Sequence, residues 1–148
     1  MKSLVRTFIL MAAMTFTYNC YCQTLPTDTV KETLLKNGWK TDHILGLDPN
    51  TETYKLTKYN PQEIFAGNLT QFLDNSTFHS QYTAWCGNDN FTNVFGKYKF
   101  LDKDKIAIAV DTVTYSGGWT KPTEHRKSNY STFTISIVKD TLILTRQK

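Results

Sequence analysis

The run of residues 86–89 (Cys-Gly-Asn-Asp) combines a thiol with a carboxylate and stands between two aromatic residues, Trp85 and Phe91. A cysteine nucleophile needs a base within reach, usually a histidine, and a site that stabilises negative charge on oxygen. The preceding histidine, His79, is an odd number of residues away, so in one extended strand the two side chains point to opposite faces. We therefore interpret Cys86 as a buried free cysteine at the end of a core strand, followed by a tight left-handed turn.

No other pattern in the sequence has the spacing of a catalytic or metal site. A zinc site requires three or four Cys, His or carboxylate ligands in recognisable spacing, and the three histidines are widely separated. Glycine-rich phosphate loops, Gly-x-Ser-x-Gly elbows and Cys-x-x-Cys pairs are also missing. We therefore expect no enzymatic activity, metal or cofactor. An enzyme would require Cys86, a histidine and a carboxylate to converge in the fold.

A second candidate site is the loop 116–128, where Trp119 stands among Lys121, His125, Arg126 and Lys127. An aromatic ring surrounded by cations can hold an acidic or sugar-like ligand, and long loops often carry function. The simpler interpretation is a solvated loop whose tryptophan folds back over the domain. Together with the loop 87–94, this loop is the predicted contact surface if the protein acts as an interaction or inhibitor module.

Composition and the first residues predict a single exported domain. The 148 residues allow one domain, and 40% hydrophobic residues exclude a disordered chain. Two basic residues precede the uncharged, largely apolar run 8–18, and small residues at positions 20 and 22 precede a cleavage site before Gln23. This layout predicts a signal peptide at 1–22. A buried N-terminal helix is the alternative.

Export would determine the compartment of the protein, and removal of the signal peptide would change the net charge and cysteine count of the mature domain, residues 23–148. We expect a secreted or periplasmic protein, or alternatively a lipoprotein anchored through Cys20 or Cys22. Without residues 1–22 the net charge of +4 falls by two and only Cys86 remains, so no internal disulfide is available. The mild charge gives no support to a nucleic-acid partner. No further segment is apolar enough to span a membrane.

The mature segment has the pattern of one short helix followed by strands. Thr29 and Glu32 form a capping box, and Gly38 stands where a helix ends, so we predict a helix at 29–37. Strands are then predicted between turn-forming residues, at 39–47, 52–59, 64–73, 77–86, 95–101, 105–115, 130–138 and 141–147.

Apolar and polar residues alternate along several of these strands, as an antiparallel sheet with one buried face requires. Such a sheet has exposed edges unless it closes. We therefore predict an all-β fold, an antiparallel up-and-down barrel of eight strands, with a two-sheet sandwich as the alternative. Its inward residues either line a ligand cavity or fill the interior. With Trp119 of the long loop, the candidate ligand-binding residues are Phe78, Tyr82, Tyr98, Phe100, Ile108, Val110, Phe133 and Ile135.

This order of features resembles the lipocalins and the lipocalin-like (calycin-type) domains of bacterial exported proteins. Gly38-Trp39 stands where the family has Gly-x-Trp, residues 128–130 (Ser-Asn-Tyr) are similar to its Thr-Asp-Tyr, and Arg146 lies near the end of the last strand. The likeness covers residues 29–147, although the glycine is one position off. It implies that Arg146 packs over Trp39 as a structural pair, and that the barrel binds a small apolar or amphipathic ligand.

Overall fold

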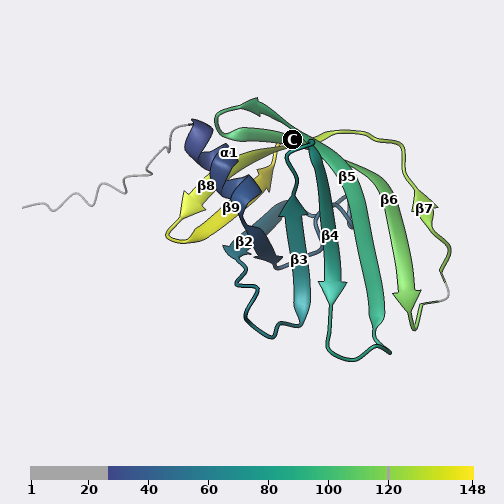
Figure 1. Cartoon of the computed structure of the whole chain (residues 1–148). Helices are drawn as coiled ribbons and strands as arrows, with labels where there is room; N and C mark the ends of the chain where they lie inside the picture. Colours follow the sequence, from purple (N-terminus) through teal and green to yellow (C-terminus); the bar gives the residue numbers. More distant parts are fainter. Residues whose placement is uncertain (1–26, 120) are drawn as a thin grey trace, which may run out of the picture.

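A computed structural model describes residues 27–119 and 121–148 of the chain (Figure 1). The predicted signal peptide, with Cys20 and Cys22, lies outside this part. Helix α1 (Thr27–Lys36) matches the predicted helix to within two residues. It is followed by β1 (Gly38–Thr41), β2 (Thr53–Lys58), β3 (Gly67–Phe72), β4 (Thr77–Thr83), β5 (Asn90–Asp102), β6 (Lys105–Gly117), β7 (Glu124–His125), β8 (Ser131–Val138) and β9 (Thr141–Arg146).

Eight of the described strands, all except β7, form one closed antiparallel ring. Their order around the ring is β1, β3, β4, β5, β6, β8, β9 and β2, which pairs with β1 again. This confirms the predicted all-β, barrel-like fold in a single sheet. The order differs from a simple meander at one place, because β1 lies between β2 and β3.

The chain therefore has to cross β1 on its way from β2 to β3. Tyr59 donates a backbone hydrogen bond to Gly38 at the start of β1, whereas β3 begins beside the end of β1. The crossover segment, residues 59–66, passes over the outer face, where Lys40 lies 5.0 Å from the centre of the Phe65 ring. The predicted strand 64–73 consequently begins only at Gly67.

A hydrophobic core fills the ring interior. Leu34 of α1 is fully buried, and the Trp39 indole is 1% exposed and donates its Nε1 hydrogen to the Leu34 carbonyl at 3.0 Å. The predicted alternation places inward side chains from every part of the ring against this pair. The core residues include Tyr54, Leu56, Phe72, Phe78, Val94, Tyr98, Ile106, Phe133, Leu142 and Leu144.

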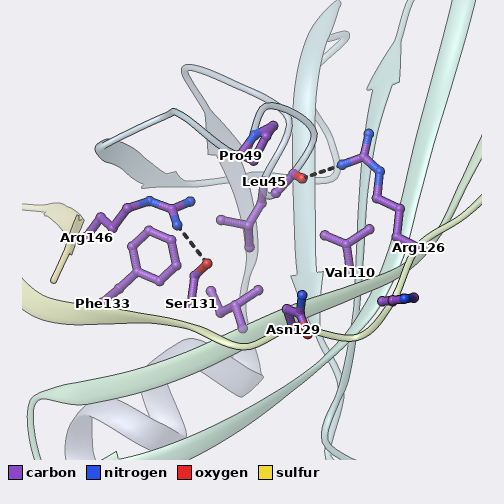
Figure 2. Close-up of a pocket in the computed structure, with 11 residues that line it drawn as sticks. Leu45, Pro49, Val110, Arg126, Asn129, Ser131, Phe133 and Arg146 are labelled. Atoms are coloured by element: carbon purple, nitrogen blue, oxygen red, sulfur yellow. Dashed lines mark hydrogen bonds between the residues drawn. The ribbon is translucent and has the colours of Figure 1, made fainter. Parts of the chain in front are cut away.

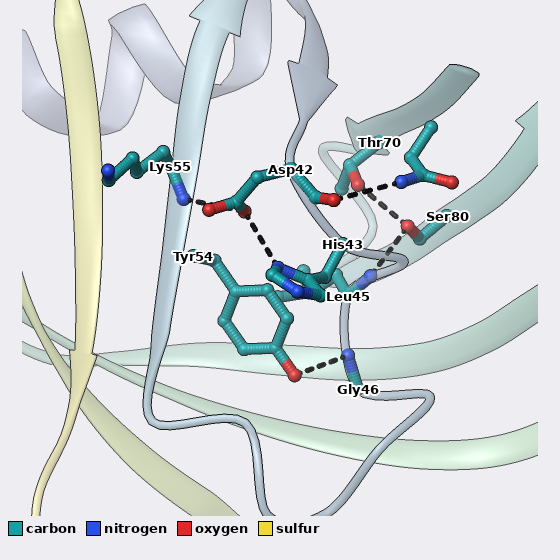
Figure 3. Close-up of polar contacts among 9 residues, drawn as sticks. Asp42, His43, Leu45, Gly46, Tyr54, Lys55, Thr70 and Ser80 are labelled. Atoms are coloured by element: carbon teal, nitrogen blue, oxygen red, sulfur yellow. Dashed lines mark hydrogen bonds and ion pairs between the residues drawn. The ribbon is translucent and has the colours of Figure 1, made fainter.

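The segment between β1 and β2 is an inserted loop, residues 42–52, so residues 42–47, predicted as the second half of a strand, are not extended structure. Leu45 is completely buried, and its backbone N–H donates to the Ser80 hydroxyl at 2.9 Å. The N–H of Gly46 donates to the Tyr54 hydroxyl at 3.1 Å (Figure 3). Gly46 has φ 77°, a left-handed conformation that ends extended structure. The apolar residues of this segment therefore pack against the core inside the ring.

The ring has an opening beside β6. β6 pairs with β8 only from Lys105 to Ile108, and further along it pairs with β7 at residues 112 and 113. Arg126 still donates its N–H to the Asp111 carbonyl of β6 at 2.9 Å, so it is the segment 127–130 that bulges away from β6 before β8 begins. β5 itself starts at Asn90, so the second half of the predicted loop 87–94 is strand. Within the described residues, no helix has the length and hydrophobicity needed to cross a bilayer.

Candidate functional site

A pocket of about 230 Å³ occupies the opening between β6, the start of β8 and the inserted loop (Figure 2). It forms because β8 separates from β6 beyond the pair Ile108–Ser131. Its walls come from segments that are far apart in the sequence. They are Leu45, Gly46, Pro49, Ile108, Val110, Arg126, Lys127, Asn129, Ser131, Phe133 and Arg146.

The inner wall of the pocket is apolar. Leu45, Ile108 and Phe133 are at most 4% exposed, and Val110 packs beside them. The hydrogen bond from Leu45 to Ser80 holds this leucine in place, and Ser80 is itself bonded to the Thr70 hydroxyl at 2.7 Å. Buried hydroxyls with partners on both sides form a rigid support. The inserted loop is therefore anchored to β3 and β4.

Arg146 is held at the rim of the pocket in one conformation. Its Nε donates to the Thr51 carbonyl at 3.1 Å, its Nη1 donates to the Ser131 hydroxyl at 2.7 Å, and its Cζ lies 5.0 Å from the centre of the Phe133 ring. The two side chains meet because Arg146 and Phe133 are cross-strand partners. Among the described residues, the guanidinium has no carboxylate partner and Nη2 donates no hydrogen bond.

The pairing of Arg146 with Trp39 implied by the family resemblance is therefore wrong. Trp39 is opposite Lys58, the last residue of β2, whereas Arg146 lies beside Glu52, just before β2 begins. The strand register thus places the two side chains at opposite ends of β2. Trp39 belongs to the core, and Arg146 stacks on Phe133 instead.

Arg126 ties the segment before β8 to the inserted loop. Its Nη1 donates to the carbonyls of Gly46 and Leu47 at 3.2 and 2.9 Å. Its Nε and Nη2 donate to Glu124 at 3.2 and 2.9 Å, and Tyr115 donates to the other oxygen of this carboxylate. These hydrogen bonds, led by that of Tyr115, lower the pKa of Glu124, and the same bond raises the pKa of Tyr115.

The rim of the pocket carries uncompensated positive charge. Of its three cations, Arg126 is neutralised by Glu124. Lys127 and Arg146 have no carboxylate within 4.0 Å in the described part of the chain. The pocket therefore combines an apolar inner wall with a cationic rim, an arrangement that suits an amphipathic ligand.

The structure places the predicted ligand-binding residues in different environments. Val110 and Phe133 line the pocket together. Phe78 and Tyr98 are buried in the core, and Phe100 packs against Tyr98 with ring centres 5.8 Å apart. Tyr82 lines a separate shallow hollow with Ile44, Asn68, Asp89, Asn90 and Thr92.

Two loops predicted as separate features meet at one end of the molecule. The N–H of Gly118 donates to the carbonyl of Asp89 at 3.3 Å. Trp119 is half-buried rather than exposed, because its ring packs edge-on against Tyr115 and is covered by Lys121 at 4.5 Å. The exposed tryptophan at this end is Trp85, at 75%.

The predictions for Cys86 are corrected at the same place. The thiol is exposed, because β4 ends at Thr83 and Cys86 lies in the turn beyond the ring. This turn is closed by a hydrogen bond from Asp89 to Cys86, and none of its residues has a positive φ. A core strand therefore does not end at Cys86, and the left-handed turn does not form.

Asp42, His43 and Ser80 are residue types of a hydrolase triad and are drawn together in Figure 3. His43 Nδ1 lies 3.4 Å from Asp42, but Ser80 is completely buried and accepts the Leu45 N–H. Lys55 also donates its N–H to Asp42 at 3.0 Å. This network holds the inserted loop and does not present a nucleophile. The part of the chain that the structure describes contains no cluster of three or more metal-ligating side chains.

No protein-family model, curated protein or solved structure matches this chain. The lipocalin-like resemblance therefore rests on the sequence features alone. Sequence reasoning missed the pocket residues Leu45 and Ser131, and it singled out Arg126 only as one cation of the loop 116–128. It singled out Arg146 but assigned it to a different partner. These four residues come together because the inserted loop and Arg126 pack against β8 and β9.

Proposed function

We propose that the protein is an exported binding protein that takes a small amphipathic molecule into the pocket beside β6. The observation that carries the proposal is the joining of an apolar wall, Leu45 and Phe133, to a fixed polar group, Arg146. Binding sites commonly combine apolar surface with a few convergent polar groups. The pocket volume of about 230 Å³ lies below the roughly 300–1,000 Å³ of sites for drug-sized ligands, so the ligand is small.

The proposal differs from a lipocalin-like central cavity in where the ligand enters. Phe78, Tyr98 and their neighbours fill the ring interior. The ligand therefore enters through the gap where β8 leaves β6. Its apolar part lies against Phe133 and Val110, and its polar part stays at the rim.

A pocket-filling variant tests the proposal. The purified protein is screened by native mass spectrometry against a set of small amphipathic molecules, and hits are quantified by calorimetry. We expect Val110→Phe to weaken binding at least about tenfold, because the larger side chain occupies the pocket. The matched control is Val138→Phe, at a 55% exposed position away from the pocket, which keeps wild-type affinity. Equal binding by the two variants, or no binding by the wild type, contradicts the proposal.

A second candidate function is a protein-interaction module, favoured by the exposed Trp85 at the end where the two loops meet. Exposed aromatic residues are enriched at interfaces. The exposed thiol of Cys86 allows a photo-crosslinker to be attached beside this tryptophan. A specific partner should be captured by the labelled wild type and lost on Trp85→Ala. Capture unchanged by this substitution argues against the interface.

A further inference from the structure

We infer that the ligand of this pocket is an organic anion, a small carboxylate with a short apolar tail, whose head group binds Arg146. The inference rests on the proposed function of the pocket and adds the chemical class of the ligand. It is carried by the charge balance of the rim, the fixed geometry of one guanidinium and the apolar wall beneath it.

The charge balance excludes a cationic ligand and disfavours a neutral one. Glu124 forms its ion pair with Arg126, accepts a hydrogen bond from Tyr115 and is not among the residues that line the pocket. Arg146 and Lys127 face the pocket without a carboxylate partner among the described residues. An anion would supply the missing countercharge.

The guanidinium of Arg146 is organised before any ligand arrives. Thr51 and Ser131 accept hydrogen bonds from Nε and Nη1, and the Phe133 ring supports its face (Figure 2). Nη2 remains as the donor without a partner in the described part of the chain. The planar guanidinium matches a carboxylate well. Because its side chain is already ordered, binding costs little additional conformational entropy.

The apolar wall beside Arg146 determines the chemistry of the remaining part of the ligand. Phe133, Leu45 and Val110 present hydrocarbon surface next to the guanidinium. A head group on Arg146 therefore directs an attached hydrocarbon chain along these side chains. The small volume favours a short chain over a long-chain lipid.

Three six-carbon probes test the inference: hexanoate, hexanol and hexylamine, titrated calorimetrically at neutral pH into the full-length protein. We expect hexanoate to bind at least about tenfold more tightly than hexanol, since hydrogen bonds to charged groups are the stronger ones, and hexylamine to bind most weakly. The affinity for hexanoate should fall with added salt, whereas that for hexanol should not. Hexyl phosphate serves as a fourth probe.

Substitutions identify the group responsible. Arg146→Gln should reduce hexanoate binding at least about tenfold and leave hexanol binding unchanged, and Arg146→Lys should give an intermediate loss because it keeps the charge without the planar fork. The matched control, Lys103→Gln, removes one charge in the exposed turn between β5 and β6 and should have no effect. Circular dichroism confirms that each variant folds, and the salt dependence of the wild type requires no variant.

The outcomes separate this inference from the proposed function. Equal affinities for the three six-carbon probes overturn the anion assignment and leave a binding pocket in place. Tighter binding of hexyl phosphate than of hexanoate overturns the carboxylate assignment. If Arg146→Gln leaves hexanoate binding unchanged and Val110→Phe abolishes it, Arg146 does not bind the head group. Failure of every amphipathic probe to bind overturns the proposed function itself.

Discussion

Arg126 and Arg146 line the same pocket but serve different purposes. Every donor nitrogen of Arg126 bonds to protein, through two carbonyls of the inserted loop and the Glu124 carboxylate. Arg146 keeps one donor nitrogen without a partner among the described residues. Since a guanidinium carries donors on three nitrogens in a fixed plane, the number already used determines whether it can bind a ligand. Arg126 therefore shapes the pocket, whereas Arg146 keeps the donor that the proposed ligand would use.

The Glu124 carboxylate should make stability depend on acid pH. Its pKa is lowered from 4.5 by the hydrogen bonds from Tyr115 and Arg126, so the unfolded chain binds this proton more readily than the folded protein does. Its stabilising contribution is present above pH 4.5 and is lost as the pH falls through the lowered pKa. We expect the free energy of unfolding to fall more steeply for the wild type than for Glu124→Gln between about pH 6 and about pH 3.

Urea unfolding at a series of pH values measures this difference. The matched control is Glu32→Gln, which removes a carboxylate from an exposed ion pair on α1 and should follow the wild-type curve. If Glu124→Gln also runs parallel to the wild type throughout the acid range, the cluster around Glu124 does not stabilise the fold through its charge.

Trp39 should contribute to stability, as its burial in the core indicates. Trp39→Phe removes part of a side chain that is 1% exposed and the hydrogen bond to the Leu34 carbonyl, so we expect a loss of about 1–3 kcal/mol. Trp85→Phe, at a 75% exposed position, should change the free energy of unfolding by less than about 0.5 kcal/mol. Urea unfolding followed by circular dichroism compares them, and equal losses would contradict the assigned role of Trp39.

At the scale of elements, local patterns predicted the hairpins and missed the irregular segments. The turn at residues 74–76 and the two-residue turn Lys139-Asp140 stand where predicted, and Ser76 and Lys139 have positive φ as such turns require. Residues 42–47 were assigned to a strand because apolar side chains are frequent there. Those side chains are buried by insertion into the ring, which periodicity cannot distinguish from pairing.

The long hairpin of β5 and β6 depends on a close contact at Gly96. The register shifts between Phe95 and Gly96, and a Cβ at Gly96 would lie 2.2 Å from the Ala109 carbonyl and 2.5 Å from Phe78. Gly96→Ala should therefore destabilise the protein by about 1–3 kcal/mol through overpacking. Thermal and urea unfolding measure this cost.

Gly87 provides the matched control. A Cβ there would meet nothing within 4 Å, so Gly87→Ala should change stability by less than about 0.5 kcal/mol. A neutral Gly96→Ala would mean that the two strands can separate locally without loss. The bulge would then not determine the spacing between β5 and β6.

At the scale of the whole molecule, the closure of the sheet into a ring was predictable from the sequence, but the order of the strands around the ring was not. Alternation and the need to remove exposed edges favour a closed sheet. That β1 lies between β2 and β3 depends on how Phe65 of the crossover segment packs against Lys40 of β1, a contact without a sequence signature. The pocket depends on this order as well, because it joins the loop after β1 to the strands β6, β8 and β9.

The same topology predicts how the ring forms. β5 and β6 are joined by a short turn, whereas β9 pairs with β2 from the opposite end of the described chain. Contacts between distant segments pay their loop-closure entropy first, so the hairpin should form before the ring closes. Leu144→Ala in β9 and Ile106→Ala in β6 truncate residues that are both fully buried. Each should cost about 2–5 kcal/mol.

The two truncations should differ in kinetics. We expect Leu144→Ala to act mainly by accelerating unfolding, with a φ-value of about 0.3 or less, and Ile106→Ala to slow folding, with a φ-value of about 0.5 or more. Stopped-flow folding and unfolding across a range of urea concentrations gives both values. If Leu144→Ala slows folding as much as Ile106→Ala, the pairing of β9 with β2 belongs to the folding nucleus. The ring would then close before its longest hairpin is complete.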